Sequence, residues 1–402
     1  NQVVQLLAAG HKNLTVVADD DQCLPAGTPV ETPGGPRLIE TLQTGDPILT
    51  AVGKGFLGTA QVSRVFRRER RARFLTFETE GGHRVTVTDN HKMFCYVPRV
   101  ATSKAFTYVY LMERRDLGWR IGVTNDLSVR LCLERSADRI VGLRACATAA
   151  EARYLEALWS LQYGIPTLPF KPRKAMVVVG EYLERLFREV DTRKNAERLA
   201  SDLSVDLSAH HFTLGAVHRG GQSRVKIIMT MCYRRHSPTG RGRLLKAAQI
   251  LHAVALETSA PVIAERLRAA GVPLRKARRG WLVRTTSASI REIGLKAEFL
   301  RELTEGVLEV RFNAGTANIQ HRSALGMPAG NVLPGHSLPV VRGNRVVYDR
   351  VVRVSEEWRT EPVFDLEVDR THNFVASGIV VHNSIYKWRG AALSNVMEFK
   401  EQ

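Results

Sequence analysis

The sequence lacks the features that mark several common classes of protein. No apolar run approaches the roughly 18 residues that a membrane-spanning helix needs, so we expect no membrane contact. The five cysteines are scattered, odd in number and without a C-x-x-C pair. We therefore expect neither a disulfide framework nor a cysteine zinc site, and a reducing, cytoplasmic location.

Acidic residues are scarce in one part of the chain. Residues 171–290 contain 23 lysines and arginines but only 9 aspartates and glutamates. Their net charge of +14 makes up most of the formal +18 of the whole chain. A basic excess gathered in one segment favours contact with nucleic acid through phosphates, although a solvated basic surface is the alternative. We expect DNA to be the partner of this segment.

The local pattern changes several times along the 402 residues, which are enough for two or three domains. A helix and a buried strand are expected in residues 1–22. Short β runs between glycine and proline turns fill residues 23–100 and return in residues 327–383. Residues 101–326 mix helical and strand patterns, and a turn and a helix are expected in residues 384–402. The fold class is therefore mixed, with an all-β domain interrupted by an α/β insert that has basic helical parts.

Two abrupt changes of character, at Cys23 and after Asn383, enclose the middle of the chain. Removal of residues 23–383 joins the ends as VVADDDQSIYKWRGA. This joined stretch resembles motif III of superfamily 1 DNA helicases of the UvrD/Rep type, so the two flanks resemble parts of an ATP-dependent DNA helicase. The resemblance places three residues in the helicase motif: Gln22, Trp388 and Arg389.

The helicase resemblance also implies what these residues do. Gln22 would sense the ATP γ-phosphate, and Trp388 would stack on bases of single-stranded DNA. The sequence contains no G-x-x-x-x-G-K-[ST] loop. ATP is therefore expected to be a cofactor of the complete host helicase, bound by strands outside this sequence.

A segment that begins with cysteine and ends with His-Asn before serine resembles an intein. CLPAGTPVETPGGPRLIETLQTGDPILT resembles the N-terminal splicing block, GGHRVTVTDNH the following T-x-x-H block, and VFDLEVDRTHNFVASGIVVHN-S the two C-terminal blocks. The resemblance implies a Hint fold in two halves, self-catalysed splicing, no cofactor and no obligate protein partner. The matching catalytic positions are Cys23, Thr88, His91, Asp365, His372, His382, Asn383 and Ser384.

The first step that this resemblance implies is an N–S acyl shift. The sulfur of Cys23 attacks the carbonyl of Gln22 and forms a thioester. An amide is a poor acyl donor, so its leaving nitrogen needs a proton and its oxyanion needs stabilisation. We assign the proton to His91, because the reference pKa of histidine lies near about 6.5, and Thr88 offers a hydroxyl to the same site.

The later steps involve the other end of the segment. The hydroxyl of Ser384 attacks the thioester, and because a hydroxyl is a weak nucleophile at neutral pH, Asp365 is the candidate base. The side chain of Asn383 then cyclises onto its own carbonyl, and His372 and His382 polarise that carbonyl and move the proton. An O–N acyl shift at Ser384 completes the peptide bond.

Two alternatives stay open at this point. A hedgehog-type autoprocessing module of the same fold needs only the first cysteine and the T-x-x-H pair, and it cleaves without splicing. The C-terminal His-Asn-Ser and the restored helicase motif favour splicing over that module. The other alternative is a helicase or DNA-binding fragment whose Hint domain does not splice or only cleaves.

Residues 101–170 resemble the GIY-YIG nuclease superfamily. TYVYLMER matches its first strand, WRIGVTNDLSVR its second strand and EARYLEALWSL its catalytic helix. The resemblance implies that Glu156 binds a divalent metal such as Mg²⁺, that Arg130 contacts phosphate and that Tyr110 assists the attacking water. Residues 171–326 would be a DNA-binding companion, and both parts together a homing endonuclease. A decayed nuclease fold that serves as a scaffold is the alternative.

Overall fold

The structure is a computed structural model, and it describes residues 23–98, 105–127, 130, 136–172, 176–178, 180–213, 225–235, 245–246, 250–278, 280–313 and 323–383. The helices and strand expected in residues 1–22 and 384–402 lie outside these described residues. The same is true of four predicted site residues, namely Gln22, Ser384, Trp388 and Arg389.

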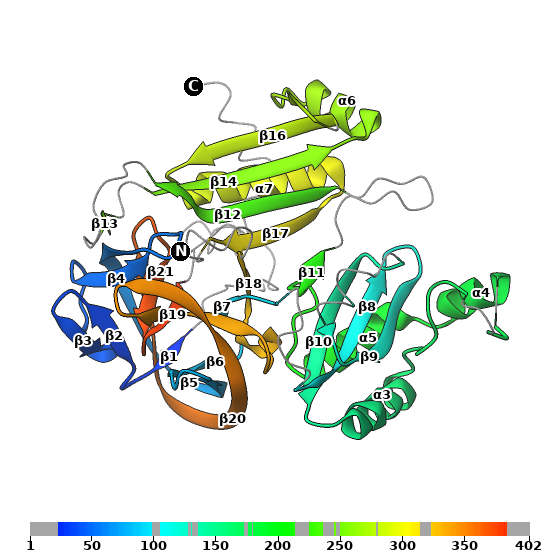
Figure 1. The fold of residues 1–402 in the computed structure, drawn as a ribbon, viewed down its shortest axis with the longest axis horizontal. Coiled ribbons are helices and arrows are strands. Elements are labelled where there is room, and N and C mark those ends of the chain that lie inside the picture. Colours follow the sequence, from blue (N-terminus) through cyan, green and yellow to red (C-terminus); the bar gives the residue numbers. More distant parts are fainter. Residues whose placement is uncertain are drawn as a thin grey trace, which may run out of the picture.

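The two ends of the described chain form one β domain, which comprises residues 23–98 and 323–383 (Figure 1). Its first half contains β1 (Leu24–Pro25), β2 (Pro29–Thr32), β3 (Gly35–Leu38), η1 (Ile39–Thr41), β4 (Pro47–Ala51), β5 (Leu57–Thr79), β6 (Arg84–Thr88) and β7 (Lys92–Cys95). Its second half contains β18 (Ala324–Pro328), η3 (Ala329–Asn331), β19 (Ser337–Arg342), β20 (Arg345–Val368), β21 (Asn373–Ala376) and β22 (Ile379–His382).

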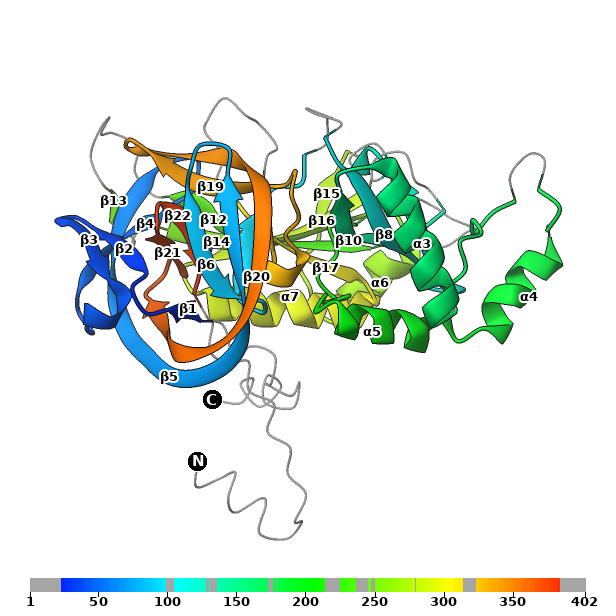
Figure 2. The same cartoon turned by 90° about the horizontal axis from the view of Figure 1, so that it is seen from below.

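The long strands β5 and β20 join the two halves of this β domain. They pair in antiparallel register from Val351 opposite Thr79 to Val368 opposite Val62, and both bend into wide arcs (Figure 2). Buried residues are concentrated toward both ends of each strand, and the central stretches are mostly exposed or half-buried. The core of the β domain takes side chains from both halves. Neither half can therefore bury its apolar surface alone.

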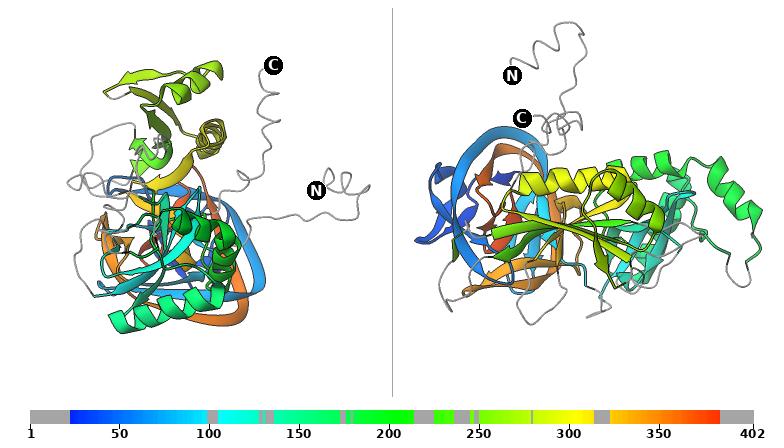
Figure 3. Two further views of the ribbon diagram at one scale, coloured as in Figure 1. Left: turned by 90° about the vertical axis from the view of Figure 1, so that its right-hand side faces the viewer. Right: turned by 90° about the horizontal axis from the view of Figure 1, so that it is seen from above.

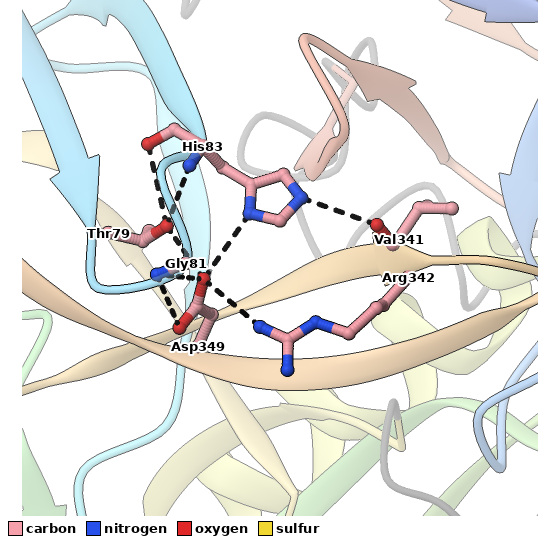
Figure 4. A network of polar contacts seen from close by, with 6 residues as sticks. All are labelled: Thr79, Gly81, His83, Val341, Arg342 and Asp349. Carbon is pink, nitrogen blue, oxygen red and sulfur yellow. Dashed lines mark hydrogen bonds and ion pairs between the residues drawn. The ribbon is translucent and has the colours of Figure 1, made fainter.

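A buried carboxylate ties the β5–β6 turn to the β19–β20 hairpin (Figure 4). Asp349 accepts hydrogen bonds from the Thr79 hydroxyl at 2.8 Å and from the Gly81 amide at 3.0 Å. Its Oδ2 also lies 3.3 Å from Nδ1 of His83 and 3.8 Å from a guanidinium nitrogen of Arg342. These contacts again connect segments from opposite ends of the sequence.

The first module of the insert, residues 105–213, is a four-stranded sheet with helices on it (Figure 1). The strand order is β11-β10-β8-β9. Its elements are β8 (Thr107–Arg114), β9 (Gly118–Thr124), β10 (Arg139–Cys146), α3 (Ala149–Tyr163), α4 (Glu181–Glu189), α5 (Thr192–Asp202) and β11 (Phe212–Thr213).

The helices of this module follow local sequence signals. Helix α3 begins after Thr148, whose side chain accepts from the Glu151 amide, and ends at Gly164 with a left-handed φ of 67°. The sequence predicts a single helical stretch over residues 181–203, but the structure has two helices there. The break occurs because Asp191 caps α5 by accepting from the Lys194 amide. Within the described residues, no helix combines the length and apolar character needed to cross a membrane.

The second module of the insert, residues 225–313, is a sheet of order β15-β16-β14-β12-β17 with α7 packed along it (Figure 3). Its elements are β12 (Lys226–Arg235), β13 (Leu245–Lys246), β14 (Ile250–Thr258), α6 (Pro261–Ala269), β15 (Arg275–Ala277), β16 (Gly280–Ser287), α7 (Ile290–Thr304) and β17 (Val307–Phe312). Strand β17 pairs with β18, and β18 pairs with β7. The second module is thus hydrogen-bonded into the β domain.

Candidate active site

The start of the β domain places Cys23 against Thr88. The Cys23 amide donates to Oγ1 of Thr88 at 3.1 Å, and the same hydroxyl donates to the Cys23 carbonyl at 3.3 Å. The Thr88 amide also donates to that carbonyl, at 3.0 Å. Only 4% of Cys23 is exposed, and Thr88 is fully buried. The nitrogen that would leave in the first reaction step therefore already carries a hydrogen bond to a buried hydroxyl.

Asp365 lies beside this cysteine. Strand β1 pairs with β20 so that Leu24 lies opposite Phe364. Cys23 immediately precedes Leu24 and Asp365 immediately follows Phe364, so both residues adjoin the same paired position of this antiparallel ladder. Asp365 is buried, and its Oδ1 accepts from the Leu366 amide at 2.9 Å. The candidate base for transesterification and the candidate thioester cysteine therefore both flank the pairing of β1 with β20.

The T-x-x-H segment forms a tight turn that the other half of the domain holds in place. The amide of His91 donates to the Thr88 carbonyl at 2.9 Å. The His91 carbonyl accepts from the Ala329 amide at 2.7 Å, and the Asp89 carbonyl accepts from the Gly330 amide at 2.7 Å. His91 is fully buried. Because only two residues separate Thr88 from His91, one turn carries both side chains.

The end of the β domain buries Asn383 without using its side chain. Its amide N–H donates to the His372 carbonyl at 3.3 Å. Asn383 is fully buried, yet within the described part of the chain neither its side-chain oxygen nor its side-chain nitrogen has a hydrogen-bond partner. Most buried polar side chains are hydrogen-bonded, so this amide is unusual. The Asn383 side-chain amide is therefore free of hydrogen bonds to the described residues that would oppose its cyclisation onto the Asn383 carbonyl.

Burial keeps the C-terminal histidines neutral at physiological pH. Burial, and next the nearby His252, lower the pKa of His372 to about 3. Burial likewise holds the pKa of His382 well below its usual value, with further lowering by the charges of Lys92, His372 and His91. A neutral imidazole can donate at one nitrogen and accept at the other, which suits proton transfer. The N-terminal and C-terminal parts of the site are close, because Val381, next to His382, pairs with Met93, two residues after His91.

The turn at residues 369–372, named the Asp369–His372 turn below, presents His372 in a strained conformation. Arg370 and His372 have left-handed φ angles of 61° and 51°. Asn373 anchors the end of the turn, because its side chain accepts from the Ala51 amide at 2.7 Å and donates to the Ala51 carbonyl at 3.0 Å. The sequence interpretation missed Asn373, although an asparagine that begins the buried strand NFVA is a signal that could have suggested a structural role.

The predicted nuclease residues are not brought together on one face of their sheet. Tyr110 is buried among side chains of α4 and lies over Gly122, and the Arg130 guanidinium is 6.0 Å from its ring. Glu156 lies on the buried side of α3, which packs against the opposite face of the sheet. The Glu156 carboxylate accepts from Arg153 at 2.7 Å. Among the described residues, no cluster of three or more histidine, cysteine or acidic side chains could hold a metal ion.

A cavity of about 910 Å³ lies where the β domain meets both modules of the insert. Side chains of the first module (Glu113, Arg139), the second module (Glu309) and the β domain (Lys92) line it, and it reaches His382. The C-terminal part of the candidate site therefore borders on the insert.

Comparison with known proteins identifies the family. The family model of the intein splicing domain matches residues 52–383, so Cys23 lies before the matched region. A comparison with curated proteins found no match.

Several solved structures resemble this one at low identity. A substituted form of the gp41-1 intein is 9% identical and has a TM-score of 0.28, with coverage of 90% of this chain and 99% of that chain. A variant of the Ssp DnaB mini-intein is 11% identical and has a TM-score of 0.31, with coverage of 92% and 98%. A DnaB intein from Synechocystis sp. PCC 6803 is 12% identical and has a TM-score of 0.28, with coverage of 91% and 100%. The family model spans well over half of the sequence, and on that ground the chain belongs to the intein splicing domain family.

Proposed function

We propose that this chain is a self-splicing intein that excises residues 23–383 and joins its two flanks. Membership of the intein splicing domain family supports autocatalytic protein splicing in general. The observation that carries the proposal is the Asn383 side chain, which is fully buried and has no hydrogen-bond partner within the described residues. Leaving such a group unpaired costs about 1–3 kcal/mol of stability. A cyclising asparagine needs its side-chain amide free of other hydrogen bonds, and the Asn383 amide meets that need within the described residues.

The first step uses the contacts around Cys23. Its Sγ forms a bond to the Gln22 carbonyl carbon, the bond between that carbon and the Cys23 nitrogen breaks, and the nitrogen gains a proton as the thiol loses one. The Thr88 hydroxyl, 3.1 Å from the leaving nitrogen, holds it in place. His91, on the same turn, is the proposed proton donor.

The second step transfers the acyl group to the C-terminal flank. The Ser384 oxygen forms a bond to the thioester carbon as the carbon–sulfur bond breaks. The Ser384 hydroxyl proton goes to Asp365, and the thiolate of Cys23 regains a proton. The pairing of Leu24 with Phe364, which Cys23 and Asp365 flank, supports this assignment.

The third step releases the intein. The Asn383 side-chain nitrogen bonds to the Asn383 carbonyl carbon, the peptide bond to Ser384 breaks, and the Ser384 nitrogen receives the proton that the amide loses. His372, whose carbonyl holds the Asn383 backbone, and His382 are the proposed proton carriers. An O–N acyl shift at Ser384 then forms the final amide. No metal, ATP or partner protein enters these steps.

The host protein that we propose is a UvrD/Rep-type DNA helicase. The support is the sequence VVADDDQSIYKWRGA, which exists only after residues 23–383 are removed. Splicing would restore this motif and with it an ATP-dependent contact with single-stranded DNA. Insertion inside such a motif makes host activity depend on excision.

Mass spectrometry of the expressed chain tests the proposal. Splicing predicts a 41-residue peptide that contains the joined motif, and a free 361-residue intein. Cys23→Ala should prevent thioester formation, and Asn383→Ala should prevent release of the intein. Persistence of the full-length chain, with its fold confirmed by circular dichroism, would contradict splicing. Cleavage at Cys23 without ligation would instead favour an autoprocessing module.

A homing nuclease in the insert stays a separate prediction. Its assay is cleavage of intein-less helicase-gene DNA that spans the insertion site, with Mg²⁺ or Mn²⁺ present. Because the sheet separates Glu156 from Tyr110, Glu156→Ala tests whether any cleavage depends on the residue assigned to the metal. DNA binding by the basic residues 171–290 would retard the electrophoretic mobility of the same DNA, and the retardation should weaken as the salt concentration rises.

A further inference from the structure

A histidine from the insert makes two hydrogen bonds at the border of the splicing site. His252, on β14, is fully buried. Its Nε2 lies 2.8 Å from the Arg370 carbonyl, and its Nδ1 accepts from the Cys232 amide at 3.3 Å. An amide can only donate and a carbonyl can only accept, so Nε2 must carry the proton and Nδ1 must be bare. The ring therefore has one neutral tautomer and one orientation.

The backbone around this imidazole is strained at three places. Cys232 lies where β12 loses register with β14, and its φ is 49°. Arg370 and His372, in the Asp369–His372 turn, have φ angles of 61° and 51°. Left-handed conformations cost about 1–3 kcal/mol each for residues other than glycine, and they collect at functional sites. The His252 ring lies edge-on to the His372 ring, with the centroids 6.2 Å apart.

The second module also supports the other C-terminal histidine. Phe312, on β17, packs against Phe94 with ring centroids 4.4 Å apart, and Phe94 packs against His382 at 5.3 Å. The backbone follows the same path, since β17 pairs with β18, β18 with β7, and β7 with β22. One apolar cluster contains buried side chains of the second module together with Val375 and Val380 of the β domain.

We propose that His252 is a positioning residue for the cyclisation of Asn383. It holds the carbonyl of Arg370, fixes the Asp369–His372 turn in its left-handed conformation, and so sets the position of His372 against Asn383. The insert thus contributes a residue to splicing. This inference rests on the proposed splicing function and adds to it a contact made by a residue that lies outside both halves of the β domain.

The experiment separates the C-terminal reaction from the N-terminal one in the full chain. In a Cys23→Ala background, C-terminal cleavage at Asn383 is followed by mass spectrometry. In an Asn383→Ala background, cleavage at Cys23 is induced by dithiothreitol. Displacements of about 1 Å at a reacting centre can cost about 100-fold in rate. We expect His252→Ala to slow C-terminal cleavage by about 10- to 100-fold, and to change dithiothreitol cleavage by less than about threefold.

Two substitutions at the same position identify the bond that matters. Glutamine can place a donor near the site of Nε2 and so keep the bond to Arg370, whereas asparagine can replace only the acceptor at Nδ1. We therefore expect His252→Gln to restore most of the C-terminal rate and His252→Asn to restore little. A role in packing alone would not distinguish these two variants.

His211 provides a matched control from the other module. It is also a buried histidine, it accepts from the Gly142 amide at Nδ1 at 2.7 Å, and its Nε2 lies 2.6 Å from the Asn331 carbonyl. It therefore joins the insert to the β domain through the same kind of backbone contacts, but away from the Asp369–His372 turn. His211→Ala should leave C-terminal cleavage within about threefold of its parent.

Each outcome decides the proposal. Equal C-terminal rates for His252→Ala and its parent would refute the role of His252 and leave the splicing function intact. Equal losses in both reactions, with glutamine no better than asparagine, would show that His252 serves the fold as a whole and would also refute it. If the Cys23→Ala parent does not cleave while folded, the proposed function fails and this inference fails with it.

Discussion

Removal of the Thr88 hydroxyl is expected to slow thioester formation and to weaken the fold by a measurable amount. In Thr88→Ala, the Cys23 amide loses an acceptor at 3.1 Å, and the Cys23 carbonyl loses a donor at 3.3 Å. Thr88 is fully buried, so water does not readily replace the hydroxyl. An unsatisfied buried amide costs about 1–3 kcal/mol of unfolding free energy. Loss of one preorganised hydrogen bond at a reacting centre costs about 10²- to 10³-fold in rate.

Two measurements on one set of variants separate these effects. Urea unfolding gives the change in free energy, and dithiothreitol cleavage at Cys23 in the Asn383→Ala background gives the rate of the first step. Thr88→Ser is the control, since it keeps the hydroxyl and should retain most of the rate. A Thr88→Ala protein that is less stable but cleaves as fast as its parent would show that Thr88 is only structural. An unchanged free energy of unfolding would show that the hydrogen bonds of the Thr88 hydroxyl do not stabilise the fold.

Three further predictions concern stability. Asn383→Ala should abolish release of the intein while raising the unfolding free energy by about 1–3 kcal/mol, because it deletes a buried amide that has no partner among the described residues; a urea titration that shows destabilisation would count against an uncommitted amide. Asp349→Ala should lower the unfolding free energy by about 2–4 kcal/mol without a selective effect on either cleavage, because it leaves the Thr79 and Gly81 donors without their buried acceptor. Burial lowers the pKa of His211 and His252 to about 4 from 6.5. The unfolded chain therefore takes up protons first as the pH falls from 6.5 to 4, and each histidine should reduce the unfolding free energy by up to about 1.4 kcal/mol per pH unit. A shallower pH dependence in His252→Gln would agree with this, and an unchanged one would not.

The parts of the site that sequence could predict are those with short-range signals. The T-x-x-H pair lies in one turn, and His382 and Asn383 are neighbours, so their types and spacing are visible without a fold. Helix α3 is similar, because a capping threonine and a terminal glycine mark its two ends. In α3, a few adjacent residues satisfy the backbone groups at the ends of the helix.

The parts that sequence could not predict depend on contacts between distant segments. His252 bonds to a carbonyl 118 residues away, and Asn373 bonds to Ala51 across 322 residues. Neither has a neighbouring residue that reveals its partner. Strand alternation explains the separation of Tyr110 from Glu156, because successive residues of a strand face opposite sides of the sheet. Which of the two faces α3 covers is decided by packing, and a motif match does not contain that information.

The two modules of the insert differ in how they relate to the splicing domain. The sheet of the first module has apolar clusters on both faces, and apart from a few side chains such as Leu333 these clusters are its own. The second module instead shares one cluster with the splicing domain, in which Phe94, Val375 and Val380 are fully buried. Removal of the second module would expose this apolar surface next to His382 and remove the bond to the Asp369–His372 turn. The β domain needs the second module in order to bury Phe94, Val375 and Val380, so in physical terms the second module is part of that domain.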